Sequence, residues 1–311
     1  MYGKKKPINV GLRIYKNKDM TYEELKYKQS WTLNQKIDHS LYIIDAFLAQ
    51  CPDSVVAYSG GVDSVVMLKL VRLIDKNRKA VFANTTNEHS DMLKFARDTE
   101  GVEMVLPRLT FQQTVANEGF PLISKKVARM IHDVRNPTPN NEASRNLYLT
   151  GIKRDGTKSK DFKIPAKYMH LIDAPFDITH KCCDILKKQP MRALSKGGVL
   201  IGTRADESQT RKGAYLKTGC IDLKGLKCLP MSIWTREDEW KFIRDNHIPY
   251  CKVYDEGEEN TGCAYCGFGC QFDKTRFLRL KDREPKRYAH MMALKNNGIT
   301  FKEALKIALD I

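Results

Sequence analysis

The sequence lacks the segments that would carry a protein into or across a membrane. No stretch approaches the roughly 20 uninterrupted apolar residues that a membrane-spanning helix needs. The first residues, MYGKKKPINVGLR, are charged and have no apolar core, so they do not resemble a secretory signal. We therefore expect a soluble, cytoplasmic protein with no membrane partner. Its hydrophobic content of 42% suffices for the core of one large domain or two.

Two common phosphate-binding patterns are missing as well, the GxxxxGK(S/T) loop and the GxGxxG dinucleotide turn. In their place stands VVAYSGGVDSVVMLKLV, residues 55–71. Its β-branched start predicts a buried strand, and the apolar residues at helical spacing after the two glycines predict a helix. A strand, a tight turn and a helix aim unpaired backbone N–H groups and the positive end of the helix at one point. That point suits a phosphate.

Within this turn we assign nucleotide contacts to Ser59, Gly60, Gly61, Val62, Asp63 and Ser64. The glycines let the backbone approach an anion closely. The hydroxyls of Ser59 and Ser64 can donate hydrogen bonds to phosphate oxygens. Asp63 would repel a phosphate, so we expect it to cap the helix or to help hold Mg²⁺.

Acidic residues are scarce, since 37 Asp and Glu stand against 53 Lys and Arg, a formal net charge of +16. The excess is uneven, with 11 basic against 4 acidic residues over 121–170 and 10 against 4 over 271–306. One interpretation is a well-mixed, solvated basic surface. The other is a polyanionic partner such as tRNA or DNA, which the interleaved Phe272, Phe277 and Tyr288 favour.

Strands and helices alternate along most of the chain. We expect strands over 54–58, 79–84, 102–106, 199–203 and 226–231, and helices over 36–50, 62–75, 88–100, 110–118 and 235–246. This order predicts an α/β fold with a doubly wound, mostly parallel sheet and a Cys-rich, helical C-terminal extension. We expect a polar lead-in over 1–35, a nucleotide-binding domain over 36–250 and a Cys-rich segment over 251–311. The domain contains a basic insertion at about 121–170, in which residues 135–163 are predicted to form a long loop.

Nine cysteines, an odd number without an export signal, argue against structural disulfides. Cys182-Cys183 and Cys263-x2-Cys266 form two pairs separated by 79 residues, and such distant pairs can enclose one soft metal centre. A vicinal pair suits the wide corners of an iron–sulfur cube better than a tetrahedral zinc ion. A 4Fe–4S cluster on these four residues, zinc, or free buried thiols are the alternatives. Cys270 is then a spare thiol beside the cluster, or a ligand in place of one of the vicinal pair.

The four remaining cysteines are expected to be small core residues: Cys51, Cys220, Cys228 and Cys251.

Residues 59–64 resemble the SGGxDS loop of the PP-loop ATP pyrophosphatase superfamily. Three further stretches resemble the phosphoadenosine-phosphosulfate (PAPS) reductase family within it. The first is Gly202-Thr203-Arg204, followed by Glu207-Ser208 and by Arg211. The second is LPMSIWTREDEW from residue 229, followed by IPY at 248–250. In this stretch we expect Thr235 to cap a helix with an acidic first turn, and we expect its role to be structural. The third is the cysteine arrangement, with a KxxP motif after the first pair. The resemblance covers roughly residues 36–290.

The resemblance implies an adenine nucleotide, ATP or adenylyl sulfate, bound with Mg²⁺ at the loop. It also implies the 4Fe–4S site of the iron–sulfur branch of sulfonucleotide reductases, at Cys182, Cys183, Cys263 and Cys266. Gly202 and Arg204 would join the nucleotide site, and Arg204 and Arg211 would clamp phosphates as planar, permanently charged groups. The expected catalytic set is Asp63, Arg204, Arg211 and Cys270. Lys125 and Lys126 face the same pocket or, as surface lysines more commonly do, the solvent.

Two features depart from the reductases of this family. Those enzymes carry a catalytic cysteine near the C-terminus that attacks the sulfate sulfur, whereas here no cysteine follows Cys270. The second departure is Asp63, which keeps the SGGxDS form of the members that cleave ATP.

Three hypotheses follow. The first is ATP-dependent transfer of sulfur from a donor to a nucleic acid, aided by the cluster, with release of AMP and pyrophosphate. The second is a sulfonucleotide reductase that makes sulfite with a thiol reductant protein. The third is a sensor or complex subunit that binds nucleotide and cluster without turnover.

Overall fold

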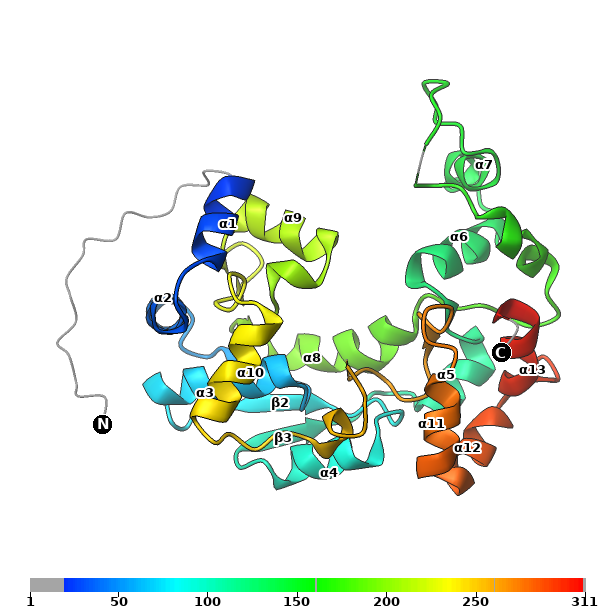
Figure 1. Cartoon of the computed structure of the whole chain (residues 1–311). Helices are drawn as coiled ribbons and strands as arrows, with labels where there is room; N and C mark the ends of the chain where they lie inside the picture. The colour runs from blue at the N-terminus through cyan, green and yellow to red at the C-terminus, as the bar shows by residue number, and fades with distance from the viewer. Residues whose placement is uncertain (1–19, 160, 260, 310–311) are drawn as a thin grey trace. The chain divides into compact units, whose positions relative to one another are not determined.

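The computed structural model describes residues 20–159, 161–259 and 261–309, so most of the expected lead-in lies outside the described residues. Six strands form one sheet in the order β3-β2-β1-β5-β7-β6. β2 runs parallel to β3 and β5 parallel to β7, whereas β6 is antiparallel to β7. The predicted α/β fold with a mostly parallel sheet and a helical C-terminal region is thus confirmed (Figure 1).

The chain divides into two compact units. Unit 1 consists of Met1–Val56, Val62–Arg78 and Gly197–Pro249, and unit 2 of Ala57–Gly61, Lys79–Lys196 and Tyr250–Ile311. The Cys-rich segment from residue 250 onward therefore belongs to the same unit as residues 79–196.

Unit 1 contains helices packed around one part of the sheet. Its elements are α1 (Tyr22–Gln29), α2 (Leu33–Gln50), α3 (Val62–Ile74), the 3-10 helix η3 (Ala205–Glu207), α9 (Gln209–Thr218) and α10 (Arg236–Asp245), with β5 (Val199–Ile201), β6 (Ile221–Asp222), β7 (Lys227–Cys228) and the start of β1 (Val55–Tyr58). Trp234 is fully buried, and its indole Nε1 donates to the Ser40 hydroxyl at 2.9 Å. The predicted Thr235 cap of α10 is confirmed as a capping box with Asp238.

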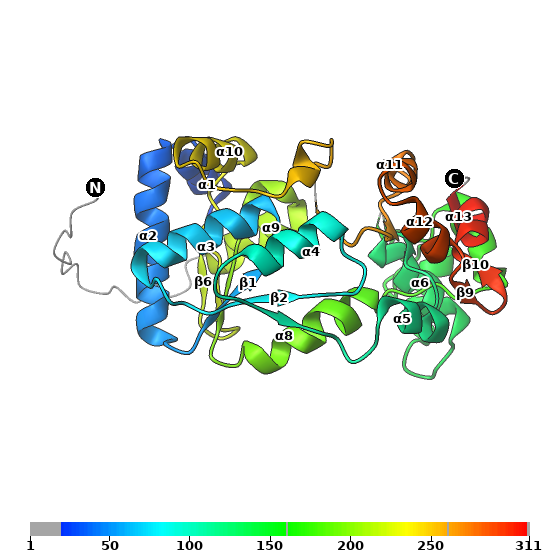
Figure 2. The same ribbon diagram turned by 90° about the horizontal axis from the view of Figure 1, so that it is seen from below.

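Unit 2 contains the rest of the sheet and a second core. Its elements are β2 (Ala80–Ala83), α4 (Ser90–Asp98), β3 (Val102–Val105), α5 (Phe111–Glu118), β4 (Leu122–Ile123), α6 (Lys125–Arg135), α7 (Glu142–Thr150), the 3-10 helix η1 (Ala166–Asp173), the π-helix η2 (Asp184–Lys188), α8 (Gln189–Leu194), the 3-10 helix η4 (Lys252–Tyr254), β8 (Gly267–Phe268), α11 (Arg276–Arg283), α12 (Pro285–Met292), β9 (Lys295–Asn296), β10 (Ile299–Thr300) and α13 (Phe301–Leu309). Figure 2 shows α4 and α8 on opposite faces of β2. The C-terminal helices pack on α5 and α6 around Phe120, Phe176 and Phe301.

The predicted helices and strands of the sheet all occur, with ends that differ by a few residues. One expectation was wrong. Residues 135–163 are not one long loop, because they contain α7. The described end of the lead-in contains α1. α7 has no fully buried residue, so the apolar periodicity that identifies most helices in a sequence is weak there.

Candidate functional site

The loop between β1 and α3 has the glycines that its packing requires. Gly60 has a φ of +74°, and a Cβ atom there would collide with the sulfur of Met92. A Cβ atom on Gly61 would lie 2.6 Å from the Thr261 hydroxyl and 3.2 Å from the Tyr254 hydroxyl. The side of the loop that belongs to unit 2 is therefore lined by hydroxyl groups, which can donate to phosphate oxygens.

The predicted nucleotide-binding residues differ in their exposure. Ser59 is exposed, whereas Val62 and Ser64 point into the buried face of α3. Ser64 is only 4% exposed, so Ser59 is the more accessible of the two predicted hydroxyl donors.

Gly202 brings the end of β5 against the start of α3. A Cβ atom at Gly202 would collide with the backbone carbonyl oxygen of Asp63. This close approach places Arg204, two residues after Gly202, beside the Asp63 carboxylate.

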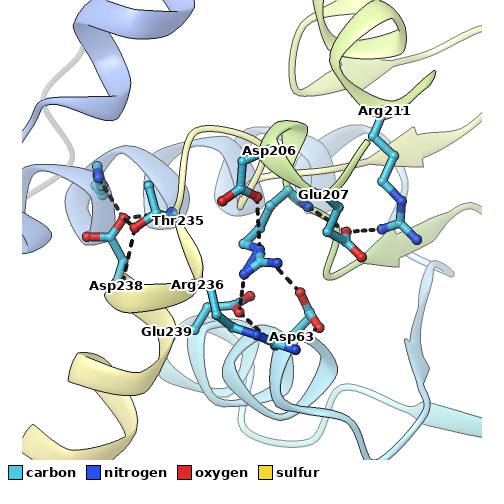
Figure 3. Close-up of polar contacts among 10 residues, drawn as sticks. Asp63, Asp206, Glu207, Arg211, Thr235, Arg236, Asp238 and Glu239 are labelled. Atoms are coloured by element: carbon cyan, nitrogen blue, oxygen red, sulfur yellow. Dashed lines mark hydrogen bonds and ion pairs between the residues drawn. The ribbon is translucent and has the colours of Figure 1, made fainter. Parts of the chain in front are cut away.

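Arg204 is almost completely buried and is held by carboxylates. Its Nη1 donates to Glu239 Oε2 at 2.7 Å, and its Nε lies 3.4 Å from Asp63 Oδ1 and 3.3 Å from Asp206 Oδ1. Arg236, the first residue of α10, lies 3.4 Å from Asp63 and 3.3 Å from Glu239 through its Nη1. Two guanidinium groups therefore share two carboxyl groups (Figure 3).

Glu239 is fully buried beneath this cluster. Burial, and then the charge of Asp63, raise the pKa of its carboxyl to about 9 against the pull of the two arginines. In this cluster, hydrogen bonds leave Glu239 Oε1, Asp63 Oδ1 and Arg204 Nε incompletely satisfied among the described residues, although Arg204 Nε and Asp63 Oδ1 lie 3.4 Å apart as an ion pair. Because incompletely satisfied buried polar atoms are costly, this group fits a site that a polar ligand completes.

Arg211 lies outside this buried group and pairs with Glu207, one turn earlier. Burial raises the pKa of Glu207, which Arg211 partly offsets. Both arginines predicted to clamp phosphates thus already hold carboxylates in the described chain. Their assignment as phosphate clamps stays a prediction, and it requires a phosphate to replace a carboxylate oxygen at the guanidinium.

The second candidate site is the cysteine cluster of unit 2, formed by Cys182, Cys183, Cys263 and Cys266. Burial, and then the other three cysteines, raise the pKa of the Cys182 thiol. Burial, and then Cys263, raise the pKa of Cys266 to about 12. Two chain segments far apart in the sequence therefore bring the four predicted ligands within electrostatic reach of one another.

Lys187 adds a half-exposed cation beside this cluster. Desolvation lowers its pKa, but Cys263, Glu88, Cys183 and Cys266 together raise it above its ordinary value. Its ammonium lies 3.9 Å from Glu88 Oε1, and its side chain is 39% exposed. A cation at this position offsets the negative charge that thiolate ligands would accumulate.

Hydrogen bonds fix the segment that contains Cys263 and Cys266. Arg276 donates to the carbonyl oxygen of Cys263 at 2.8 Å and to that of Cys266 at 3.3 Å. Thr85 Oγ1 lies 3.5 Å from the Cys263 sulfur. Throughout 20–159, 161–259 and 261–309, no group of three or more His, Cys, Asp or Glu stands close enough to hold a metal ion. The donor set nevertheless fits a wider, soft iron–sulfur centre, because it consists of four thiols within electrostatic reach of one another.

Cys270 is fully buried, and its sulfur donates to the carbonyl oxygen of Cys266 at 3.2 Å. A catalytic cysteine needs an accessible thiolate, and burial raises the pKa of this thiol. Its catalytic assignment stays a prediction without support from this geometry. The other four cysteines are buried, as predicted.

Lys125 and Lys126 are exposed at the start of α6. Lys126 Nζ lies 3.7 Å from Asp161 and 4.8 Å from the centre of the Phe162 ring. These contacts favour the alternative that the two lysines face solvent.

Sequence reasoning missed Arg236, Glu239, Glu88 and the individual role of Lys187. Arg236 and Glu239 stand in the WTREDEW stretch, which was assigned a structural role. Nothing in the sequence indicates that the carboxyl group of Glu239 is buried.

The fold and the turn together define a PP-loop type of nucleotide-binding α/β protein. The model of the phosphoadenosine phosphosulfate reductase domain matches residues 53–163 and 152–268. The chain belongs to this family.

Among curated proteins, the chain is similar to enzymes named adenosine 5'-phosphosulfate reductase. It is 29% identical to the one from Lysinibacillus sphaericus over 89 residues, 28% of this chain and 38% of that protein. It is 24% identical to the one from Oceanobacillus iheyensis over 69% of this chain and 71% of that protein. It is 20% identical to the one from Geobacillus sp. over 79% of this chain and 88% of that protein. The match thus spans little more than a third of the first relative's length.

Among solved structures, the chain is similar to a phosphoadenylyl-sulfate (PAPS) reductase from Candida auris in a phosphate complex. The sequence identity is 12% and the TM-score 0.42, over 79% of this chain and 97% of that chain. Among the described residues no helix is both long and apolar enough to cross a membrane.

Proposed function

We propose that the chain is an iron–sulfur sulfonucleotide reductase, which converts adenylyl sulfate or its 3'-phosphorylated form into sulfite and an adenosine phosphate. The observation that carries this proposal is that two distant segments bring Cys182, Cys183, Cys263 and Cys266 within electrostatic reach of one another, with Lys187 beside them. The names of the relatives support the same reaction class.

The residues of the chain divide the work between two sites. The loop 59–64 and the arginines Arg204, Arg211 and Arg236 bind the nucleotide phosphates and balance the charge of the leaving phosphate. Cys182, Cys183, Cys263 and Cys266 would hold the 4Fe–4S cluster, which would supply iron and sulfide as a polarisable, soft centre. Lys187 holds a positive charge beside these four ligands.

The reductive chemistry needs two thiols. A thiolate attacks the sulfate sulfur, the S–O bond to the nucleotide breaks, and the nucleotide phosphate leaves. A second thiol attacks the sulfur of the first, so that sulfite leaves with the electron pair of the broken S–S bond and the two thiols, which supplied the two electrons, remain as a disulfide. Since Cys270 is buried, we assign these thiols to a reductant protein or a small dithiol.

An anaerobic preparation with counted iron and sulfide tests this proposal, with adenylyl sulfate and dithiothreitol as substrates. We expect about four irons per chain and the formation of sulfite with AMP. Cys263→Ser should lose iron and sulfite formation together, whereas Cys251→Ser, a buried cysteine outside the cluster, should keep both. A Cys263→Ser protein with full iron would refute the assignment of the cluster.

A second candidate is ATP-dependent transfer of sulfur to a nucleic acid. Two separate features favour it, the burial of Cys270 and the presence of Asp63 in the loop. The same preparation decides between the two. AMP and pyrophosphate from ATP, with adenylyl sulfate untouched, would replace the first proposal with the second. In that case Asp63→Ala should abolish AMP formation and leave the iron content unchanged.

A further inference from the structure

Residues 151–158 form an ordered turn that presents cations to solvent, here called the basic hairpin. Ile152 and Lys158 pair as an antiparallel bridge. The Lys153 amide donates to the Thr157 carbonyl at 2.9 Å, and Asp155 Oδ1 accepts from the Thr157 hydroxyl at 2.6 Å. Figure 1 shows this segment extending past α7, away from α5 and α11. The hairpin is therefore a defined backbone structure of unit 2.

The charge of the hairpin has few local counter-charges. Lys153, Arg154 and Lys158 are exposed, and none of them forms an ion pair with another described residue. Asp155 is occupied by Thr157, whose hydrogen bonds lower the pKa of that carboxyl. Over residues 151–167 the sequence has six Lys or Arg and two Asp, a net charge of +4. Such an excess of positive charge creates a field that a polyanion neutralises.

An aromatic ring lies next to these cations in the sequence. Phe162 is 46% exposed, and Lys126 lies 4.8 Å from the centre of its ring. An exposed ring beside cations is the combination on which single-stranded bases stack. A membrane surface would instead require a continuous apolar face, whereas the exposed Ile152 and Phe162 are separate positions on irregular backbone.

We propose that the basic hairpin and Phe162 are a docking surface for single-stranded nucleic acid, with Lys153, Arg154 and Lys158 on the phosphate backbone. This inference goes beyond the proposed function and does not depend on it. It also assigns part of the excess positive charge of residues 121–170 to the basic hairpin.

Fluorescence anisotropy of labelled single-stranded 20-mers of DNA and RNA, titrated from 50 to 200 mM NaCl, tests the proposal. Each phosphate contact contributes about 0.7 to the slope of log affinity against log salt. We expect the triple variant Lys153→Gln, Arg154→Gln, Lys158→Gln to lower the slope by about 2 and the affinity at 100 mM salt by roughly tenfold or more. Phe162→Ala should weaken single-strand binding by about tenfold with little change in the slope.

The matched control removes three exposed lysines from unit 1: Lys217→Gln, Lys224→Gln and Lys227→Gln. It changes the net charge equally and should leave affinity and slope unchanged. Equal losses in both triple variants would overturn the proposal in favour of a general charge effect. So would an absence of binding at 50 mM salt, or tighter hairpin-dependent binding to anionic lipid vesicles than to nucleic acid. Reduction of adenylyl sulfate by the hairpin variant should match that of the unaltered chain, so the two proposals can fail separately.

Discussion

At the scale of single residues, Glu239 is the carboxyl on which the geometry of the arginine cluster depends. It is fully buried, accepts from Arg204 at 2.7 Å and lies 3.3 Å from Arg236. Removing this buried acceptor deprives an N–H group of Arg204 of its hydrogen bond, while Asp63 and Asp206 remain as counter-charges, at a cost of about 1–3 kcal/mol. We therefore predict that Glu239→Ala lowers the free energy of unfolding by that amount, measured by urea denaturation.

Glu237 provides the control for this prediction because it lies on the same helix, α10, but is exposed. Glu237→Ala should change the free energy of unfolding by no more than about 0.5 kcal/mol. Similar effects of the two substitutions would mean that the buried pair of Glu239 with Arg204 contributes little to stability.

At the scale of elements, the junction of β5 with α3 aligns the nucleotide loop with Arg204. A methyl group at Gly202 would collide with the carbonyl oxygen of Asp63 and with the side chain of Met67. We predict that Gly202→Ala destabilises the fold by about 1–3 kcal/mol, the usual cost of overpacking, and weakens nucleotide binding at the displaced loop. Thermal unfolding and titration with an ATP analogue measure the two effects.

Gly213 in α9 is the matched control for Gly202. A Cβ atom there meets no other atom within 4 Å, and its backbone is helical. Gly213→Ala should therefore stabilise the protein by about 0.4–1 kcal/mol. If Gly202→Ala were equally stabilising, the strand and helix would have room that the structure does not show.

Local patterns predicted the elements of the sheet because their periodicity and caps act over neighbouring residues. The strand at 55–58 and the Thr235 cap are such cases. The pairing of Arg204 with Glu239 could not be read in this way, because it joins residues 35 positions apart through the fold. The resemblance likewise predicts that Arg204 binds a phosphate. In the structure its side chain contacts the carboxyl groups of Asp63, Asp206 and Glu239. The cysteine pairs were recognised from their spacing. The position of Lys187 beside them could not be, because it depends on how the fold places η2.

At the scale of the whole molecule, the two units each contain residues from distant parts of the chain. Unit 2 combines residues 79–196 with the segment from 250 onward, which joins the two cysteine pairs. Linear composition suggested a separate C-terminal segment because Gly and Cys become frequent there. Composition could not reveal that Phe301 of α13 stacks on Phe120, which lies just after α5, with 5.2 Å between the ring centres. This contact joins the C-terminal helices to the rest of unit 2.

Each unit also contains a histidine that should make the stability of the molecule depend on pH. Burial, with Lys28 nearby, lowers the pKa of His39 in unit 1 from 6.5 to about 4. Burial does the same for His89 in unit 2, where Arg283 and Arg276 lower the pKa and Glu258 and Glu284 oppose them. Between pH 6.5 and 4 the unfolded chain therefore binds more protons than the folded one, so stability should fall as the pH falls through this range.

We predict a loss on the order of 2–3 kcal/mol per histidine between pH 6.5 and pH 4, measured by urea denaturation at intervals of half a pH unit. His39→Gln and His89→Gln should each flatten this dependence, because a glutamine does not titrate. Trp31, whose ring centre lies 5.6 Å from that of His39, reports on unit 1 by its fluorescence. If both variants kept the full pH dependence, the carboxylates would be its source and the two histidines would be charged in the folded protein.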